Sequence, residues 1–145
     1  MAMPTYACVA EYDAACTDAG RDALAVMRGV IARLVPESAR EERLSYGLPT
    51  LFVQGKRVVH YAGWAEHLAL YPVPESPPGD PGLRVDLVPH IKGKGTLHFP
   101  YAASLPVPLL ERVVRAHLVR IGWSEDSADG ADAGAGADVG AEAER

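Results

Sequence analysis

Apolar residues recur at three- and four-residue spacing in two stretches of the chain, the pattern of an amphipathic helix. The first stretch follows Thr17, a candidate N-cap, and ends before Pro36. Its apolar positions are Leu24, Met27, Ile31 and Leu34. The second stretch begins at Pro108, a residue that the first helical turn accepts. Its apolar positions are Leu109, Leu110, Val113, Val114, Leu118 and Ile121. The pattern therefore predicts two helices, one on each side of the central region.

The region between these helices has a different pattern, rich in β-branched and aromatic residues. Residues 48–54 and 57–63 predict two strands of a hairpin that turns at Gly55-Lys56, and residues 67–73 and 93–100 predict two more. Residues 6–15 fit a short helix or a strand equally well. Short helical segments are expected at 37–43 and near Leu83, Leu87 and Ile91, with a proline-rich loop at 73–82.

The order of these elements indicates the fold class. Helices come first, then a meander of strands, then a closing helix, which is typical of an α+β protein rather than of α/β. An amphipathic helix needs an apolar surface to cover, and an antiparallel sheet offers one on a single face. We therefore expect one antiparallel sheet of about four to six strands with the helices packed on one face.

One stretch, LSYGLPT at residues 44–50, places glycine and proline inside an expected strand. Strand interiors usually exclude both residues. Gly47 permits a backbone conformation or a close approach that a Cβ would block, and Pro49 pushes Leu48 into extended geometry. We expect the pair to bend or bulge an edge strand and so re-aim Tyr46. Two interpretations remain open: a purely structural role, or a pocket-lining role for Tyr46.

The acidity of the chain is concentrated at its C-terminal end. The whole chain has 14 basic and 19 acidic residues, a net charge of −5. Residues 124–145 contain seven acids and one base, so residues 1–123 retain 13 bases and 12 acids, a net charge of +1. We expect an α+β domain at 1–123 and a disordered, Ala/Gly/Asp-rich acidic tail at 124–145. A near-neutral domain beside an acidic tail argues against nucleic acid as a partner.

Length and the remaining composition narrow the class of protein further. A chain of 145 residues suits one domain. The sequence has no apolar run near the ~18 residues of a membrane helix and no basic-then-apolar leader, so we expect a cytoplasmic protein without a membrane partner. Its two cysteines are too few for a disulfide framework.

The candidate chemistry rests on histidines and on a glycine-rich segment. None of the five histidines forms a HxxxH or HExxH pair. If their strands are neighbours, His67 and His98 would line one pocket with Tyr46 and Tyr71. The segment KGKGT, with Lys94 and Thr96, fails the phosphate-loop pattern, but its glycine N–H groups would suit an anion. A purely structural role remains the alternative for each of these residues. The sequence shows no recognisable catalytic nucleophile, so a binding protein is favoured over an enzyme.

Three motifs, taken together, resemble the YdhG-like family: YGLP at 46–49, HLALYP at 67–72 and KGTLHFP at 94–100. With the closing helix, the resemblance covers about residues 9–121. The family is largely a domain of unknown function, described as a frataxin-like α/β sandwich. One branch is regarded as an iron chaperone that serves iron–sulfur cluster and haem assembly. The chain departs from the family pattern at 65–66, where Ala-Glu replaces a basic residue, and the acidic tail has no counterpart.

These observations leave three functional hypotheses open. The first, implied by the resemblance, is a small cytoplasmic carrier that handles iron and serves iron-using assembly proteins. Its metal ligands would be carboxylates such as Asp18 and Asp22, which share a helix face with Arg21 beside them. The second is a small-molecule or anion-binding module, open to enzymatic activity, with a pocket around Tyr46, His67, Lys94 and His98. The third is an accessory protein that works through its sheet face and tail.

Overall fold

The structure is a computed structural model that describes residues 5–124. The expected acidic tail therefore lies outside the described residues, apart from Ser124. The elements, in chain order, are α1 (Val9–Ala15), α2 (Asp18–Leu34), the 3₁₀ turn η1 (Glu37–Ala39), β1 (Arg40–Ser45), β2 (Leu48–Val53), β3 (Lys56–Gly63), β4 (His67–Tyr71), α3 (Leu83–Leu87), the 3₁₀ turn η2 (Val88–His90), β5 (Ile91–Lys92), β6 (Thr96–Pro100) and α4 (Val107–Arg120).

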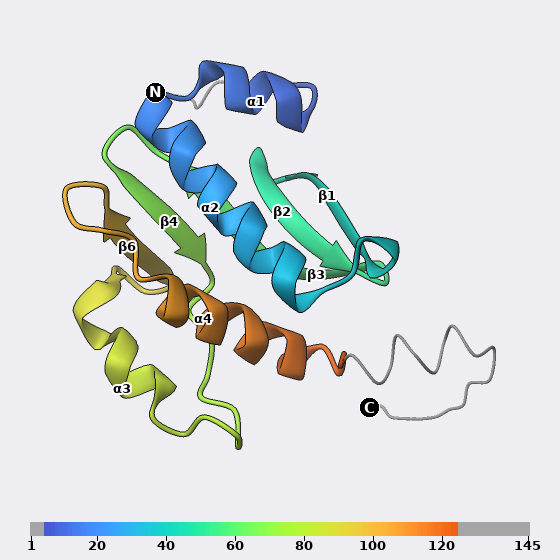
Figure 1. Cartoon of the computed structure of the whole chain (residues 1–145), viewed down its shortest axis with the longest axis vertical. Helices are drawn as coiled ribbons and strands as arrows, with labels where there is room; N and C mark the ends of the chain where they lie inside the picture. The colour runs from blue at the N-terminus through green and yellow to red at the C-terminus, as the bar shows by residue number, and fades with distance from the viewer. Residues whose placement is uncertain (1–4, 125–145) are drawn as a thin grey trace.

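The strands form one six-stranded sheet in the order β1-β2-β3-β4-β6-β5, and every neighbouring pair is antiparallel. Helices α2 and α4 lie side by side across one face of this sheet (Figure 1). The α+β class, the antiparallel sheet and the helices on one face are thus confirmed. No helix within residues 5–124 is both long and apolar enough to cross a membrane.

The hydrophobic core lies between the sheet and this helix layer. Helix α2 begins as expected, because the Thr17 hydroxyl accepts a hydrogen bond from Gly20 N at 3.1 Å. Its Leu24 and Met27 are fully buried, as are Leu68 and Leu70 on β4. Because side chains alternate along a strand, the residues that flank these two leucines on β4 point to the other face of the sheet, which neither α2 nor α4 covers.

The expectation of a short helix at 37–43 is wrong. Only the turn η1 at Glu37–Ala39 is helical, and the charged residues that follow form the edge strand β1. The physical reason is strand pairing: all six residues of β1 have partners on β2. Ile91 is likewise a strand residue in β5 rather than part of a helix. The ambiguous residues 6–15 contain helix α1.

The YGLP stretch is a hairpin turn rather than a bulged strand. Ser45 pairs with Leu48, and the two residues between them have positive φ angles, 55° at Tyr46 and 78° at Gly47. Two consecutive positive φ values are typical of a type I′ turn. The bulge that we expected here lies instead between Leu51 and Phe52, where β2 pairs with β3. The following turn has the same geometry at Gln54-Gly55, one residue before the expected position.

We expect Gly47→Val to lower the free energy of unfolding by about 1–3 kcal/mol, because valine is strained at positive φ. A Cβ at this position would meet no atom within 4 Å, so the loss would report the backbone conformation alone. Urea denaturation measures it. Gly79→Val is the matched control, since its Cβ also meets nothing within 4 Å and its φ is not in the positive range. Equal stability of the two variants would rule out this account of the turn.

Candidate ligand-binding face

The face of the sheet that α2 and α4 leave uncovered collects most of the residues singled out from the sequence. We call it the open face. Strand alternation and register place His67 and Tyr71 of β4 on it, together with Thr96 and His98 of β6. Ala69, between the two β4 residues, is paired with His98 and is fully buried, yet it is not part of the main core cluster. The polar side chains around it therefore cover a small second apolar patch.

Two aromatic side chains meet across this face. The indole Nε1–H of Trp64 donates a hydrogen bond to the Tyr71 hydroxyl at 2.9 Å. Trp64 follows the end of β3, whereas Tyr71 ends β4, so their side chains must reach toward each other along the sheet. Ala62 and Ala69 are fully buried on the two strands concerned, and their small side chains leave room for the rings.

The two open-face histidines are in direct contact. The ring centroids of His67 and His98 are 4.0 Å apart, and the ring planes are inclined by 16°. His98 faces Ala69, so the two histidines are diagonal neighbours on adjacent strands. Partial burial, followed by the nearby His67 and Lys92, lowers the pKa of His98, which favours the neutral imidazole.

Tyr46 lies at a different part of the open face. The residue is 81% exposed, and its ring contacts the His60 ring at a centroid distance of 5.9 Å. The Arg57 guanidinium lies 5.1 Å from the Tyr46 ring centroid. The buried Thr50 hydroxyl is 2.6 Å from Nδ1 of His60, which holds that imidazole in place. Burial, followed by the charge of Arg57, lowers the pKa of His60.

Positive charge accompanies these rings. The guanidinium of Arg43 lies 3.8 Å from the centroid of the Phe52 ring and has Glu41 as its ion-pair partner at 3.5 Å. Lys92 is paired with Thr96 and so shares the face with His98. Arg57, by contrast, has no carboxylate partner within residues 5–124; its side chain donates to the Ser45 hydroxyl at 3.5 Å. The open face therefore combines planar rings with uncompensated cations.

The expectation of one shared pocket is only partly met. His67, Tyr71, Thr96 and His98 share a face, and two of them touch. Tyr46 makes its ring contacts with His60 and Arg57 instead, and Lys94 lies in the turn between β5 and β6. The residues that the sequence interpretation missed are His60, Trp64 and Arg57. The alternation of His60, Ala62 and Trp64 was the available signal for the first two.

The carboxylates proposed from the sequence lie on the helix layer, away from this face. Asp18 forms an ion pair with Arg21, one turn along α2, and its side chain is 94% exposed. Asp22 is exposed on the same helix. Within residues 5–124, no three His, Cys, Asp or Glu side chains are grouped so that they could hold a metal ion. Iron binding at Asp18 and Asp22 stays a prediction.

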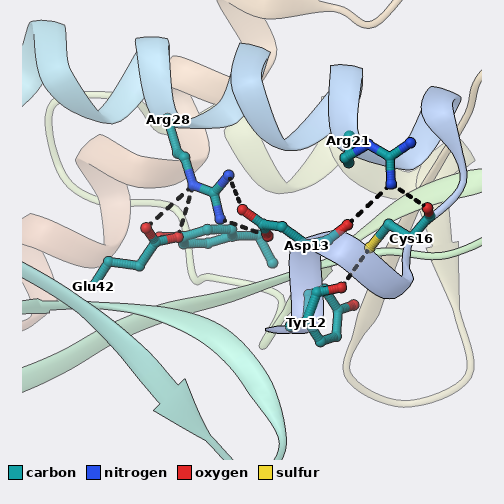
Figure 2. Close-up of polar contacts among 7 residues, drawn as sticks. Tyr12, Asp13, Cys16, Arg21, Arg28 and Glu42 are labelled. Carbon is teal, nitrogen blue, oxygen red and sulfur yellow. Dashed lines mark hydrogen bonds and ion pairs between the residues drawn. The ribbon is translucent and has the colours of Figure 1, made fainter. Parts of the chain in front are cut away.

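A half-buried ionic cluster around Arg28 has a structural role. Figure 2 shows Arg28 between Glu42 and Asp13: its guanidinium is 2.9 Å from a carboxylate oxygen of each. The Tyr61 hydroxyl also donates to Glu42, at 2.8 Å. Burial, followed by the charge of Glu42, raises the pKa of Tyr61. The cluster ties α1, α2, β1 and β3 together and occupies the acidic side chains that would otherwise be free.

The half-buried Cys16 is not an activated thiol. Its Sγ donates to the carbonyl oxygen of Tyr12 at 3.4 Å, and its own carbonyl accepts from Arg21 at 2.7 Å (Figure 2). Burial, followed by the negative charge of Asp13, raises the pKa of the Cys16 thiol, whereas a reactive cysteine needs a lowered one.

Comparison with known proteins identifies the fold. The chain superposes on the crystal structure of a DUF1801-family protein, YdhG from Bacillus subtilis, with a TM-score of 0.61, 16% sequence identity, and coverage of 89% of this chain and 96% of that one. The resemblance to the YdhG-like family is confirmed at the level of the fold. No family model matches the sequence. No curated protein matches it either. The frataxin-like and iron-chaperone expectations are not addressed by this likeness and stay predictions.

Proposed function

We propose that the chain is a binding protein whose open face takes an anionic ligand that carries a planar ring. The observation that supports this proposal most is Arg57, a guanidinium without a carboxylate partner in the described residues, placed against the exposed ring of Tyr46. A guanidinium presents several N–H donors in a plane and suits carboxylate or phosphate groups. An adjacent exposed aromatic ring offers a stacking surface.

The open face is large enough for a ligand with separate charged and planar parts. Strands β2, β3, β4 and β6 are consecutive neighbours, so the three gaps between them span roughly 15 Å at ~4.8 Å each. Tyr46 and Arg57 lie toward one end of this span, and His67 and His98 lie toward the other. A nucleoside diphosphate has both a heteroaromatic ring and two phosphates, and it therefore matches this combination of rings and cations.

Binding rather than catalysis is favoured by the state of the ionisable groups. The half-buried carboxylates within residues 5–124 are all held by arginines: Asp13 and Glu42 by Arg28, Asp80 by Arg112, and Glu111 by Arg33. On the open face, His60 is engaged by Thr50. A recognition role does not require a free acid or base. Iron delivery, which the family resemblance implied, remains a separate prediction that none of these contacts supports.

We expect ADP to bind with micromolar affinity and to change the fluorescence of Trp64, which lies on the open face. The chain has two tryptophans. Trp123 is buried, and its indole N–H has no hydrogen-bond partner among the described residues. Trp123→Phe therefore removes no hydrogen bond and leaves Trp64 as the only source of tryptophan fluorescence. Titrations of this variant with ADP, adenosine and inorganic phosphate, all with EDTA, measure the contribution of each part. ADP should bind more tightly than either fragment.

The matched pair of variants is Arg57→Gln and Arg115→Gln. Both remove one positive charge, but Arg115 is an exposed residue of α4, on the helix side. Arg57→Gln should weaken ADP binding by about tenfold, the typical loss of a charge-assisted hydrogen bond, whereas Arg115→Gln should leave it unchanged. The absence of a saturable ADP response, or equal affinities in the two variants, would refute the proposal.

A further inference from the structure

His67 and His98 are placed by the most regular part of the sheet. Strands β4 and β6 are neighbours with four paired positions, from His67 with Pro100 to Leu70 with Leu97. The leucines and phenylalanine on the core side of these strands are buried to within 1% exposure, so the backbone that carries both histidines is firmly held. The two histidines are therefore held at adjacent positions of the open face, whereas their half-buried rings can still turn.

The ring nitrogens of this pair are unused. Within residues 5–124, neither the His67 nor the His98 imidazole makes a hydrogen bond with a protein group, although His60 and His117 both do. Both rings are only half-buried, and Nε2 is the ring atom farthest from the Cβ. Two adjacent imidazoles thus offer free nitrogens from the same face of one sheet.

We propose that His67 and His98 form a two-imidazole binding site for a divalent transition metal ion of the Zn²⁺, Ni²⁺ and Cu²⁺ class. Imidazole nitrogen is a preferred ligand of these ions. Two nitrogens bound to one tetrahedral ion at ~2.05 Å lie about 3.3 Å apart. Ring planes inclined by only 16° do not converge on one ion, so both imidazoles must turn out of the stack about their side-chain torsions before a nitrogen of each reaches the ion. The proposal does not depend on ADP binding, because neither Arg57 nor Tyr46 takes part in it.

The surroundings define how strong and how open the site is. The two histidines supply two ligands, so water or an external anion must complete the coordination shell. Lys92 is paired with Thr96, two residues before His98, so its positive charge opposes a bound cation. We therefore infer a labile site of micromolar affinity, with open positions that face solvent.

The test is a Zn²⁺ titration of the full chain labelled with ¹⁵N-histidine, followed by NMR of the imidazole nitrogens. Side-chain nitrogen resonances report each histidine separately, so cations that bind carboxylates elsewhere do not interfere. We expect the resonances of His67 and His98 to move together and to saturate at one equivalent. Those of His90 and His117 should not follow them. Failure of the His67 and His98 resonances to respond at about ten equivalents would overturn the proposal.

The variants His67→Gln, His98→Gln and His90→Gln separate chelation from single-histidine binding. Each single loss in the pair should weaken Zn²⁺ binding about tenfold or more, because a chelate loses one of its two anchors. His90 contacts Phe99, a core-side residue, and its replacement should change the affinity less than twofold. Glutamine is tolerated at half-exposed strand positions, so each variant should fold. A circular dichroism spectrum of each variant shows whether the fold is retained. Undiminished Zn²⁺ binding in either pair variant would overturn the chelate.

Discussion

Gly20→Ala is expected to destabilise the protein by about 1–3 kcal/mol, although alanine is the better helix former by roughly 1 kcal/mol. A Cβ at Gly20 in α2 would lie 2.9 Å from the carbonyl oxygen of Gly63 at the end of β3. The contact is reciprocal, because a Cβ at Gly63 would lie 2.8 Å from the carbonyl oxygen of Gly20. Both obstacles are backbone atoms, so neither can rotate away as a side chain would.

The contact between these glycines sets the distance between the first helix turn of α2 and the sheet. Relief of the clash would require α2 to move away from β3, and that movement would loosen the packing of Leu24. The Leu24 side chain lies 3.2 Å from the position of a Cβ built at Gly63. Close-packed interiors resist such a shift. Gly63→Ala should therefore be destabilising for the same reason and to a similar extent.

The same helix provides the control for this prediction. Gly29 lies in the middle of α2, and a Cβ there would meet only the Arg33 side chain, at 3.9 Å. Gly29→Ala should raise the free energy of unfolding by roughly 0.5–1 kcal/mol through helix propensity alone. Urea denaturation of both variants gives the comparison. If Gly20→Ala were as stabilising as Gly29→Ala, α2 would not approach β3 as closely as described.

The second large effect is a loss of stability as the pH falls from about 6.5 toward 4, caused by His117. This residue of α4 is 1% exposed. Its Nε2–H donates to the carbonyl oxygen of Pro72 at 2.9 Å, and its Nδ1 accepts from Nε of Arg120 at 3.3 Å. The neutral imidazole thus satisfies both neighbours, and protonation would break the contact with Arg120.

The sign of the pH dependence follows from these contacts. Burial lowers the pKa of His117 to about 4; the Pro72 carbonyl opposes this shift, and the charges of Arg120 and His60 reinforce it. An unfolded histidine has a pKa of about 6.5, so between these values the unfolded state binds more protons. The stabilisation is complete above pH ~6.5 and decreases by at most ~1.4 kcal/mol per pH unit as the pH falls.

Urea denaturation between pH ~7.5 and ~5 measures this slope, because most carboxylates stay ionised in that range. His117→Gln keeps a hydrogen-bond donor for Pro72 but cannot titrate, so its stability should depend much less on pH. The smaller contributions of His60 and His98, whose pKa values are also lowered by burial, should remain. His90→Gln should retain the slope of the parent chain. A slope in His117→Gln as steep as in the parent would exclude His117 as its source.

The sequence predicted most elements because a helix or strand that buries one face has apolar residues at a regular spacing. Leu24, Met27 and Ile31 indicated α2 from their spacing, and the structure buries all three. Strand β1 could not be found in this way. It lies at the edge of the sheet and reads REERLS, so it has no apolar alternation to detect. Its inward-facing Glu42 is accommodated by Arg28 and Tyr61, which come from distant parts of the chain.

For the candidate face, the sequence alone determined which residues of a strand point to the same side: His67 with Tyr71 on one strand, and Thr96 with His98 on another. It also marked Gly47 as a position with either an unusual backbone conformation or a close approach, and the structure shows the first, a φ of 78° with no atom within 4 Å of a Cβ. The tertiary structure decided which strands are neighbours. Pairing of β4 with β6 brings His67 onto His98, whereas a hairpin turn places Tyr46 against His60 and Arg57. The physical reason is that alternation depends on each strand alone, while strand order depends on how the whole core packs beneath α2 and α4.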